Sequence, residues 1–367
     1  MEVGKLSINQ TNLHDKMLEN YLLAKESMPK NQMSSHWDVF PDDFEKAIQD
    51  ADAWKFFLRN AISIGFNDDL IDFGNSRFID NNETLNGWEM RKKHDFRLLL
   101  PPIMKDSKLK NEVGEHLKHL FSICGIEFVL NNIGSNVGSP MQLAFSIDSD
   151  QKTYYCNRHE LGIIYYLYQI SRSIDLLLSV ENPTVVEIGA GFGSLIEKLK
   201  SQFPKSRCIL LDLPELSAVQ TYYLFNSFPE TNICLYDDYL KMGTKVFSNE
   251  FDFLILPGWI IEEVGAEDAD LFINMRSMME MTYPIISYYF NNIQRIIKNN
   301  GLFACINRYE KYSRLKDYPF DDFWEIVLSQ TSQVQNHIHD LILRRSNKKN
   351  PFPISEVLKT FPPHDKR

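Results

Sequence analysis

The segment Val185-Val186-Glu187-Ile188-Gly189-Ala190-Gly191-Phe192-Gly193 runs from an apolar stretch into a glycine-rich turn. The apolar stretch is typical of a buried strand, and the residues from Ser194 onward have the spacing of a helix. Glycine allows positive φ angles and close approach of the backbone to a ligand, and a helix that begins at such a turn offers free N–H groups. The segment therefore predicts a strand–turn–helix unit that binds a ligand at the turn.

The spacing of the glycines and two nearby acidic residues restrict the kind of ligand. A dinucleotide-binding loop has the pattern G-x-G-x-x-G, and Ser194 stands where the third glycine would be. Glu187 suits an ammonium group or a ribose hydroxyl and is unfavourable beside a pyrophosphate. Asp212 ends the next apolar stretch, about 20 residues after the first glycine, where doubly wound folds place a carboxylate against ribose. Together these features favour S-adenosylmethionine over a nicotinamide cofactor.

From residue 184 onward, short apolar stretches rich in β-formers alternate with helical ones. This alternation predicts an α/β fold, with a Rossmann-like, doubly wound, mostly parallel sheet and helices on both faces. The part of the chain before residue 150 is expected to be mainly helical. The expected strands are 184–188, 208–211, 251–256, 270–273, 302–306 and 337–344, with 231–236 as a further candidate, and the expected helices of this part are 194–202, 214–227, 278–299 and 321–329.

The composition excludes several classes of protein. A net charge of −10 argues against a broad surface for nucleic acid or for an anionic membrane. The five cysteines form no C-x-x-C pair, so neither a disulfide framework nor a thiolate zinc site is expected, and His116 with His119 lacks further ligands at a recognised spacing. We therefore predict no metal. The N-terminus has no signal-peptide pattern and no apolar stretch approaches the ~20 residues of a membrane helix, so we expect a cytoplasmic protein without membrane insertion.

Several further segments carry a resemblance to a known family: Val186–Gly193, Leu211–Glu215, Tyr222–Leu224, Leu256–Trp259, Asp270–Met281 and Asn307–Arg308. On these segments the chain resembles the sugar O-methyltransferases within the class I S-adenosylmethionine-dependent methyltransferases. The N-x-x-S-x-x-E-M pattern at residues 274–281 is the most specific of them. The resemblance covers residues 135–345 well and the first 130 residues loosely. The family often has asparagine before the tryptophan, where this chain has Gly258, which removes the basis for a polar role there.

The resemblance implies a set of residues that hold S-adenosylmethionine. Glu187 and the glycines would hold the methionine part, and Asp212 the ribose. Trp259 resembles the adenine-side contact of such enzymes, and an ordinary core tryptophan is the alternative. Tyr165 resembles a residue of the segment that closes over the cofactor carboxylate, although it also belongs to a row of core aromatics. The full expected set is Tyr165, Glu187, Gly189, Ala190, Gly191, Gly193, Asp212, Leu213, Trp259 and Asn274.

Methyl transfer to a hydroxyl needs a group that accepts the hydroxyl proton, and ligands of doubly wound folds lie at the carboxyl edge of the sheet. Glu280, which follows the strand that ends at Asn274, is the first candidate for this base. An acid that interacts with a helix dipole is the alternative interpretation. His159 is the second candidate, although a lone histidine is more often structural. Asn274 and Ser277 are expected to orient the acceptor hydroxyl or to cap the turn.

Residues that follow the strand 302–306, Arg308 and Tyr309, are expected to contact the acceptor. Trp88 and the basic cluster Arg91-Lys92-Lys93-His94 are further candidates for such contacts. At 367 residues the chain is expected to hold about two domains. The expected division is an acceptor-binding or lid region at 1–150, a methyltransferase domain at 151–346 and a C-terminal tail at 347–367.

The sequence thus predicts an S-adenosylmethionine-dependent O-methyltransferase. It would methylate a sugar hydroxyl, on a nucleotide sugar or a glycan-assembly intermediate, by in-line displacement with help from a general base. Two alternatives stay open, namely a methyltransferase of a polyketide, phenolic or amine acceptor and a catalytically silent cofactor-binding scaffold. A nicotinamide oxidoreductase is disfavoured by Ser194. The expected partner is a sugar or glycan rather than nucleic acid, and the sequence leaves open whether the chain forms a homodimer.

Overall fold

A computed structural model describes residues 11–29, 42–59, 62, 77–80, 83–86, 103–104, 107–140, 142–146, 152–177 and 180–362 of the chain. The chain divides into two compact units. Unit 1 comprises Met1–Val39 and Gln169–Arg367, and unit 2 comprises Phe40–Tyr168. The division of function at residue 150 that the sequence predicts stays a prediction.

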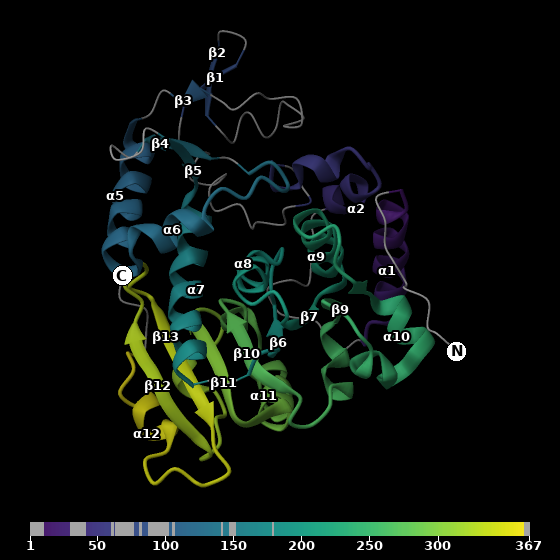
Figure 1. Cartoon of the computed structure of the whole chain (residues 1–367), viewed down its shortest axis with the longest axis vertical. Coiled ribbons are helices and arrows are strands. Elements are labelled where there is room, and N and C mark those ends of the chain that lie inside the picture. The colour runs from purple at the N-terminus through teal and green to yellow at the C-terminus, as the bar shows by residue number, and fades with distance from the viewer. Residues whose placement is uncertain are drawn as a thin grey trace. The chain divides into compact units, whose positions relative to one another are not determined.

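The centre of unit 1 is an eight-stranded sheet in the order β12-β13-β11-β10-β6-β7-β9-β8 (Figure 1). All neighbouring strands are parallel except that β13 runs antiparallel to both β11 and β12. This arrangement confirms the expected Rossmann-like, mostly parallel sheet. The strands are β6 (Thr184–Ile188), β7 (Arg207–Asp212), β8 (Ile233–Cys234), β9 (Phe253–Pro257), β10 (Ala269–Met275), β11 (Ile297–Arg308), β12 (Trp324–Thr331) and β13 (Ile338–Arg345).

The strand order contains a switch point between β6 and β10. From β6 the chain moves outward to β7 and to the edge strand β8, and it comes back one place to β9. It then crosses to β10 and β11 on the other side of β6. Right-handed crossovers in opposite directions leave a crevice at the carboxyl ends of the two central strands, where doubly wound folds bind their ligands. The glycine-rich turn follows β6 directly, so the sheet places this turn at its ligand-binding edge.

Helices connect the strands of unit 1, and apolar side chains fill the space between helices and sheet. Every residue of β6 is buried, as expected for a strand covered on both faces. The helices and 3₁₀ turns are α1 (Leu13–Ser27), α8 (Ser194–Gln202), α9 (Pro214–Ser227), α10 (Tyr236–Met242), η4 (Gly243–Ser248), η5 (Gly258–Glu263), η6 (Met278–Glu280), α11 (Tyr283–Ile296), η7 (Leu315–Asp317) and α12 (Ile354–Leu358). Figure 1 shows α1 beside α9 and α10, and α1 contacts both of them.

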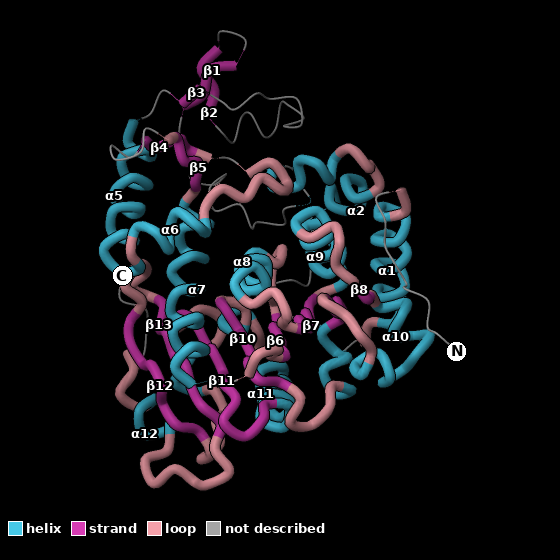
Figure 2. The backbone as a smooth tube through the Cα atoms, viewed as in Figure 1, coloured by secondary structure: helices cyan, strands magenta, loops and turns pink. Residues whose placement is uncertain are grey.

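Two of the sequence-based assignments in this unit are wrong. The helix expected at 321–329 is the strand β12, which Figure 2 shows in magenta beside β13. Trp324, Ile326 and Leu328 alternate along it, and pairing with β13 outweighs the helical spacing of the same side chains. The helix expected at 278–299 begins only at Tyr283, since Pro284 suits the first turn of a helix, and it ends where β11 begins.

Unit 2 is mainly helical over its described residues, as expected. Helix α7 begins where Asn157 caps it, because Asn157 Oδ1 accepts a 2.8 Å hydrogen bond from the backbone N–H of Glu160. The elements that begin in this unit are α2 (Asp42–Ile48), η1 (Ala53–Arg59), β1 (Arg77–Asp80), β2 (Glu83–Asn86), β3 (Ile103–Met104), α5 (Ser107–Cys124), α6 (Ile126–Asn132), β4 (Leu143–Ser146), β5 (Thr153–Cys156) and α7 (Arg158–Leu177). None of the helices described in either unit combines the length and the apolar character that crossing a membrane would require.

Candidate active site

The cofactor loop, Gly189–Gly193, joins β6 to α8 in a conformation that requires glycine. Gly189, Gly191 and Gly193 have φ angles of +70°, +61° and +94°. The backbone N–H of Gly193 donates a 3.0 Å hydrogen bond to Ala190 O, and α8 begins at the next residue. The loop therefore has the tight geometry that the sequence predicts, with a helix N-terminus at its end.

Glu187 lies on β6, two residues before the loop, and is completely buried. Neither of its carboxylate oxygens has a hydrogen-bond partner within the described part of the chain. Burial, and then the nearby Asp212, raise the pKa of Glu187 to about 8. A buried carboxyl without partners is costly, and a cationic group at the ligand edge of the sheet would satisfy it. This arrangement fits a ligand with an ammonium group.

Asp212 ends β7, and both oxygens of its carboxylate accept hydrogen bonds. Its Oδ1 accepts from the backbone N–H of Leu213 at 2.8 Å, and its Oδ2 accepts from Gln220 Nε2 at 2.7 Å. Burial raises the pKa of Asp212 to about 7 despite these bonds. Gln220 Nε2 also donates to Gly191 O at 2.9 Å, so this buried amide joins the cofactor loop to the end of β7. No local pattern in the sequence marks Gln220.

The β10 turn, Asn274–Glu280, packs against the cofactor loop. Asn274 Nδ2 donates to Ile188 O at 3.0 Å and to Ser277 Oγ at 2.5 Å, and Ser277 Oγ donates to Ile188 O at 3.1 Å. Asn274 Oδ1 accepts from Met278 N at 3.2 Å and from Asn307 Nδ2 at 2.9 Å. Asn274 is completely buried and the protein uses all of its polar positions, so in this structure it holds the turn in shape.

Glu280 closes this turn and is the one acidic residue in the segment 274–280. Its side chain is 15% exposed, and Oε1 lies 2.5 Å from Lys311 Nζ. Its backbone N–H donates to Ser277 O at 3.0 Å. The ion pair holds the Glu280 side chain against Lys311, while Ser277 of the same turn contacts the strand that leads into the cofactor loop.

Trp259 follows β9 and is partly buried. Its backbone carbonyl accepts a 3.2 Å hydrogen bond from Tyr288 Oη, and its ring meets that of Tyr236 edge to face at 6.4 Å. It packs against the main core of unit 1, which is compatible with both interpretations of this residue. Leu213 and Ala190, the remaining apolar members of the expected set, lie next to Asp212 and inside the cofactor loop, respectively.

Gly258 leaves space that a tyrosine from α11 fills. An ideal β carbon at Gly258 would lie 2.6 Å from Tyr289 Oη and 3.7 Å from Asp212 O. Burial, and then Asp212, raise the pKa of Tyr289 far above its ordinary value of 10. The Tyr289 hydroxyl thus lies against Gly258, just after the end of β9. No local pattern in the sequence singled out Tyr289.

Arg308 and Tyr309 occupy different surroundings. Arg308 is half-buried at the last position of β11, at the same edge of the sheet as the cofactor loop. Tyr309 is buried, and its hydroxyl hydrogen-bonds with Thr331 Oγ1 at 2.7 Å and with His339 Nδ1 at 3.0 Å. The Tyr309 hydroxyl therefore takes part in a network with β12 and β13, while an acceptor contact by Arg308 stays a prediction.

The remaining candidate residues lie in unit 2 or outside the described residues. His159 and Tyr165 are on α7 within unit 2, where Tyr165 is completely buried and its ring meets that of Tyr166 edge to face at 5.2 Å. Their roles stay predictions. Trp88 and the cluster 91–94 lie outside the described residues. Over the ranges that the structure describes, no group of three or more His, Cys, Asp and Glu residues could hold a metal ion.

Comparison with known proteins gives similarities of structure only. No family model and no curated protein matches the chain. The pyocyanin biosynthetic protein PhzM is 12% identical, with 51% of this chain and 56% of that chain covered and a TM-score of 0.32. The mitomycin 7-O-methyltransferase MmcR is 16% identical, with 51% and 55% covered and a TM-score of 0.34. TYW2 of M. jannaschii, solved in complex with AdoMet, is 13% identical, with 56% and 85% covered and a TM-score of 0.31. The chain therefore spans little more than half the length of the first two proteins.

Proposed function

We propose that this chain is an S-adenosylmethionine-dependent methyltransferase. The observation that carries the proposal is the Glu187 carboxyl, which is buried without a hydrogen-bond partner among the described residues, two positions before the cofactor loop. S-adenosylmethionine has an ammonium group that such a carboxyl would bind, and it has no pyrophosphate that the carboxyl would repel. The loop lies at the switch point of the sheet, where ligands of doubly wound folds bind.

The residues at this edge fit the parts of that cofactor. Glu187 would bind the ammonium group, and Asp212, oriented by Gln220, would accept hydrogen bonds from the ribose hydroxyls. Trp259 would contact the adenine side. When bound, S-adenosylmethionine supplies a methyl group already activated by the positive charge on sulfur. The protein then has to align the acceptor and remove one proton from it.

Glu280 is the proposed general base. A carboxylate can accept a proton from a hydroxyl, and Lys311 Nζ, 2.5 Å from Oε1, holds the Glu280 side chain in place. The hydrogen bonds of Asn274 and Ser277 fix the β10 turn that carries Glu280 relative to the cofactor loop. We assign Asn274 and Ser277 the role of positioning residues for this base.

A sugar hydroxyl is the proposed acceptor, on the strength of the resemblance of residues 274–281 and their neighbours to the sugar O-methyltransferases. The test is a screen with methyl-labelled S-adenosylmethionine against nucleotide sugars, short glycans, phenols and amines. We expect label on a nucleotide sugar or glycan. Label on a phenol or amine alone would overturn the sugar acceptor and leave the methyltransferase assignment standing. Cofactor binding without transfer to any class would favour the silent scaffold.

A further inference from the structure

Helix α1 pairs with two buried acidic residues of unit 1. Lys25 Nζ lies 2.6 Å from Glu215 Oε1, and the Glu215 side chain is only 2% exposed. Lys16 Nζ lies 3.1 Å from Asp237 Oδ2, and the Asp237 side chain is 7% exposed. Buried carboxylates depend on such partners, so these two lysines anchor α1 on α9 and α10.

Asn20 of α1 also acts on the beginning of α10. Its Oδ1 accepts a 2.7 Å hydrogen bond from the backbone N–H of Asp237, and its Nδ2 donates to Lys16 O at 2.9 Å. Asp237 is in the first turn of α10, where backbone N–H groups have no partner within the helix. Leu235, which precedes the helix, has no polar side chain to cap it. Asn20 therefore supplies from another helix what a capping side chain normally supplies.

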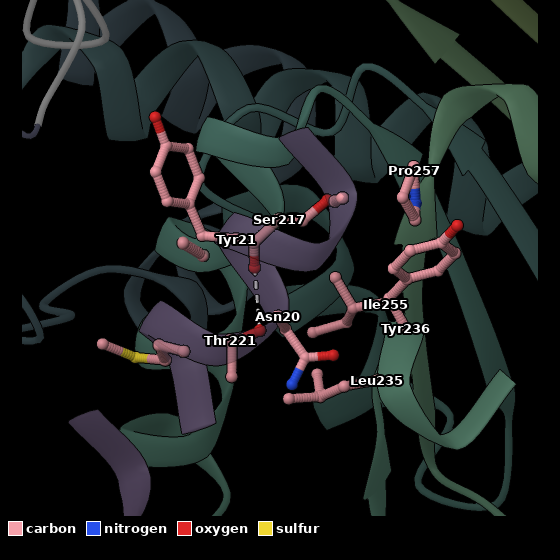
Figure 3. A pocket seen from close by; sticks show the side chains of 11 residues that line it. Asn20, Tyr21, Ser217, Thr221, Leu235, Tyr236, Ile255 and Pro257 are labelled. Carbon is pink, nitrogen blue, oxygen red and sulfur yellow. Dashed lines mark hydrogen bonds between the residues drawn. The ribbon is translucent and has the colours of Figure 1, made fainter. Parts of the chain in front are cut away.

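The contact between α1 and the sheet extends to the segment that carries Trp259. Figure 3 shows the side chains around a small pocket between α1, α9 and β9, in which Tyr21 of α1 and Tyr236 of α10 lie on two sides and Pro257 ends β9. Pro257 is two residues before Trp259. The pocket lining thus brings α1 together with Tyr236 and with the end of the strand that precedes Trp259.

Tyr236 connects the first turn of α10 to Trp259. It precedes Asp237, is 5% exposed, and meets the Trp259 ring edge to face at 6.4 Å. We infer that α1 is a positioning element of the cofactor site, because Asn20 fixes the first turn of α10 and this turn holds Tyr236 against Trp259. The inference rests on the proposed function in one respect, namely that Trp259 contacts the adenine side of S-adenosylmethionine.

The test compares Asn20→Ala with Asn226→Ala in the full chain. Asn226 Nδ2 donates to Tyr222 O at 2.8 Å, so both substitutions remove the same kind of bond within a helix, and only Asn20 also bonds to α10. Calorimetry with S-adenosylhomocysteine should give a Kd about five-fold higher for Asn20→Ala and unchanged for Asn226→Ala. In a Trp259→Phe background, Asn20→Ala should raise the Kd by a smaller factor. Asn20 acts on the site through Tyr236 and Trp259, so the two substitutions are not independent.

Hydrogen exchange of the α10 amides gives a second readout that does not need a ligand. Exchange at residues 236–239 should be faster in Asn20→Ala and unchanged in Asn226→Ala. If the parent chain binds S-adenosylhomocysteine and Asn20→Ala binds it equally well, the inference is overturned and the proposed function stands. If the parent chain binds neither S-adenosylmethionine nor S-adenosylhomocysteine, the proposed function fails. If the amides of residues 236–239 also exchange equally fast in Asn20→Ala and in the parent chain, Asn20 does not position α10, and the inference fails independently. Should Asn20→Ala fail to fold, Lys16→Met takes its place, because it removes the ion pair between α1 and Asp237 of α10. Its control is Lys118→Met, which removes an exposed ion pair with Glu115.

Discussion

Ser277 occupies the space beside Gly189 so completely that an ideal β carbon on Gly189 would lie 2.2 Å from Ser277 Oγ and 2.4 Å from Ser277 Cβ. Ser277 Oγ in turn donates a hydrogen bond to Ile188 O at 3.1 Å. The cofactor loop after β6 and the turn after β10 are therefore packed directly against each other. A substitution that enlarges a side chain in one of these segments should therefore displace the other.

Substitution of Gly189 tests this contact. Gly189→Ala combines a positive φ with overlap onto Ser277, whereas Gly193→Ala has a positive φ and only ordinary contacts of 3.5–3.7 Å with Leu224. We expect Gly193→Ala to lower the free energy of unfolding by about 1–2 kcal/mol and Gly189→Ala by about 1–3 kcal/mol more. Adding Ser277→Gly should recover part of the difference. Equal losses in urea denaturation for the two alanine variants would contradict the packing argument.

The pKa of Glu187, raised to about 8 by burial and then by Asp212, predicts two pH effects. Between pH 4.5 and about 8 the folded chain holds a proton on Glu187 that the unfolded chain releases, so this contribution to stability is complete below pH 4.5 and disappears as the pH rises through 8. Glu187→Gln should therefore flatten the fall in stability over this range. Thermal unfolding between pH 5 and 8 measures the slope for both chains.

A cationic ligand should also drive the Glu187 proton off, because it stabilises the ionised form. Calorimetry of S-adenosylmethionine binding at pH 7, in two buffers of different ionisation enthalpy, should show proton release for the parent chain and less for Glu187→Gln. Asp212, whose pKa burial raises to about 7, should account for the remainder. Identical heats in the two buffers would argue against a protonated Glu187 as the cation-binding group.

Gly258 and Tyr289 should behave as a coupled pair. A methyl group at Gly258 would lie 2.6 Å from Tyr289 Oη, so Gly258→Ala should cost about 1–3 kcal/mol of stability, and much less in a Tyr289→Phe background. Denaturation of the two single variants and the double variant gives the interaction free energy. Additive losses would mean that the tyrosine moves aside without cost.

Glu280→Gln tests the proposed general base. Loss of a general base lowers kcat by about 10²- to 10⁴-fold while cofactor binding is kept, so we expect a large fall in kcat and little change in the Kd of S-adenosylhomocysteine. Glu250→Gln, at an exposed position, is the matched control. Turnover at the parent rate in Glu280→Gln would remove Glu280 from the mechanism.

Local signals in the sequence are enough to predict the centre of the fold. Strand 184–188 and helices 194–202 and 214–227 have the expected bounds, because a buried apolar run, a glycine turn and Pro214 at a helix start are all encoded by neighbours in the chain. The Glu187 and Asp212 positions follow from the same local pattern.

What the sequence does not predict depends on partners that are distant in the chain. The strand β12 exists because β13 pairs with it, and its own spacing also suits a helix. Gln220 and Tyr289 reach the cofactor edge from helices, where their spacing gives no sign of their neighbours. Helix α1 likewise belongs to unit 1 through Lys16, Asn20 and Lys25, contacts that the spacing of its own residues does not reveal.

Binding of S-adenosylmethionine and S-adenosylhomocysteine to the full chain, measured by isothermal titration calorimetry with NADH as the comparison ligand, tests the central claim most directly. We predict saturable binding of both sulfur compounds at one site per chain, weakened by Glu187→Gln, and no binding of NADH. Binding of NADH alone, or of none of the three compounds, would contradict the assignment of Glu187 and the cofactor loop to S-adenosylmethionine.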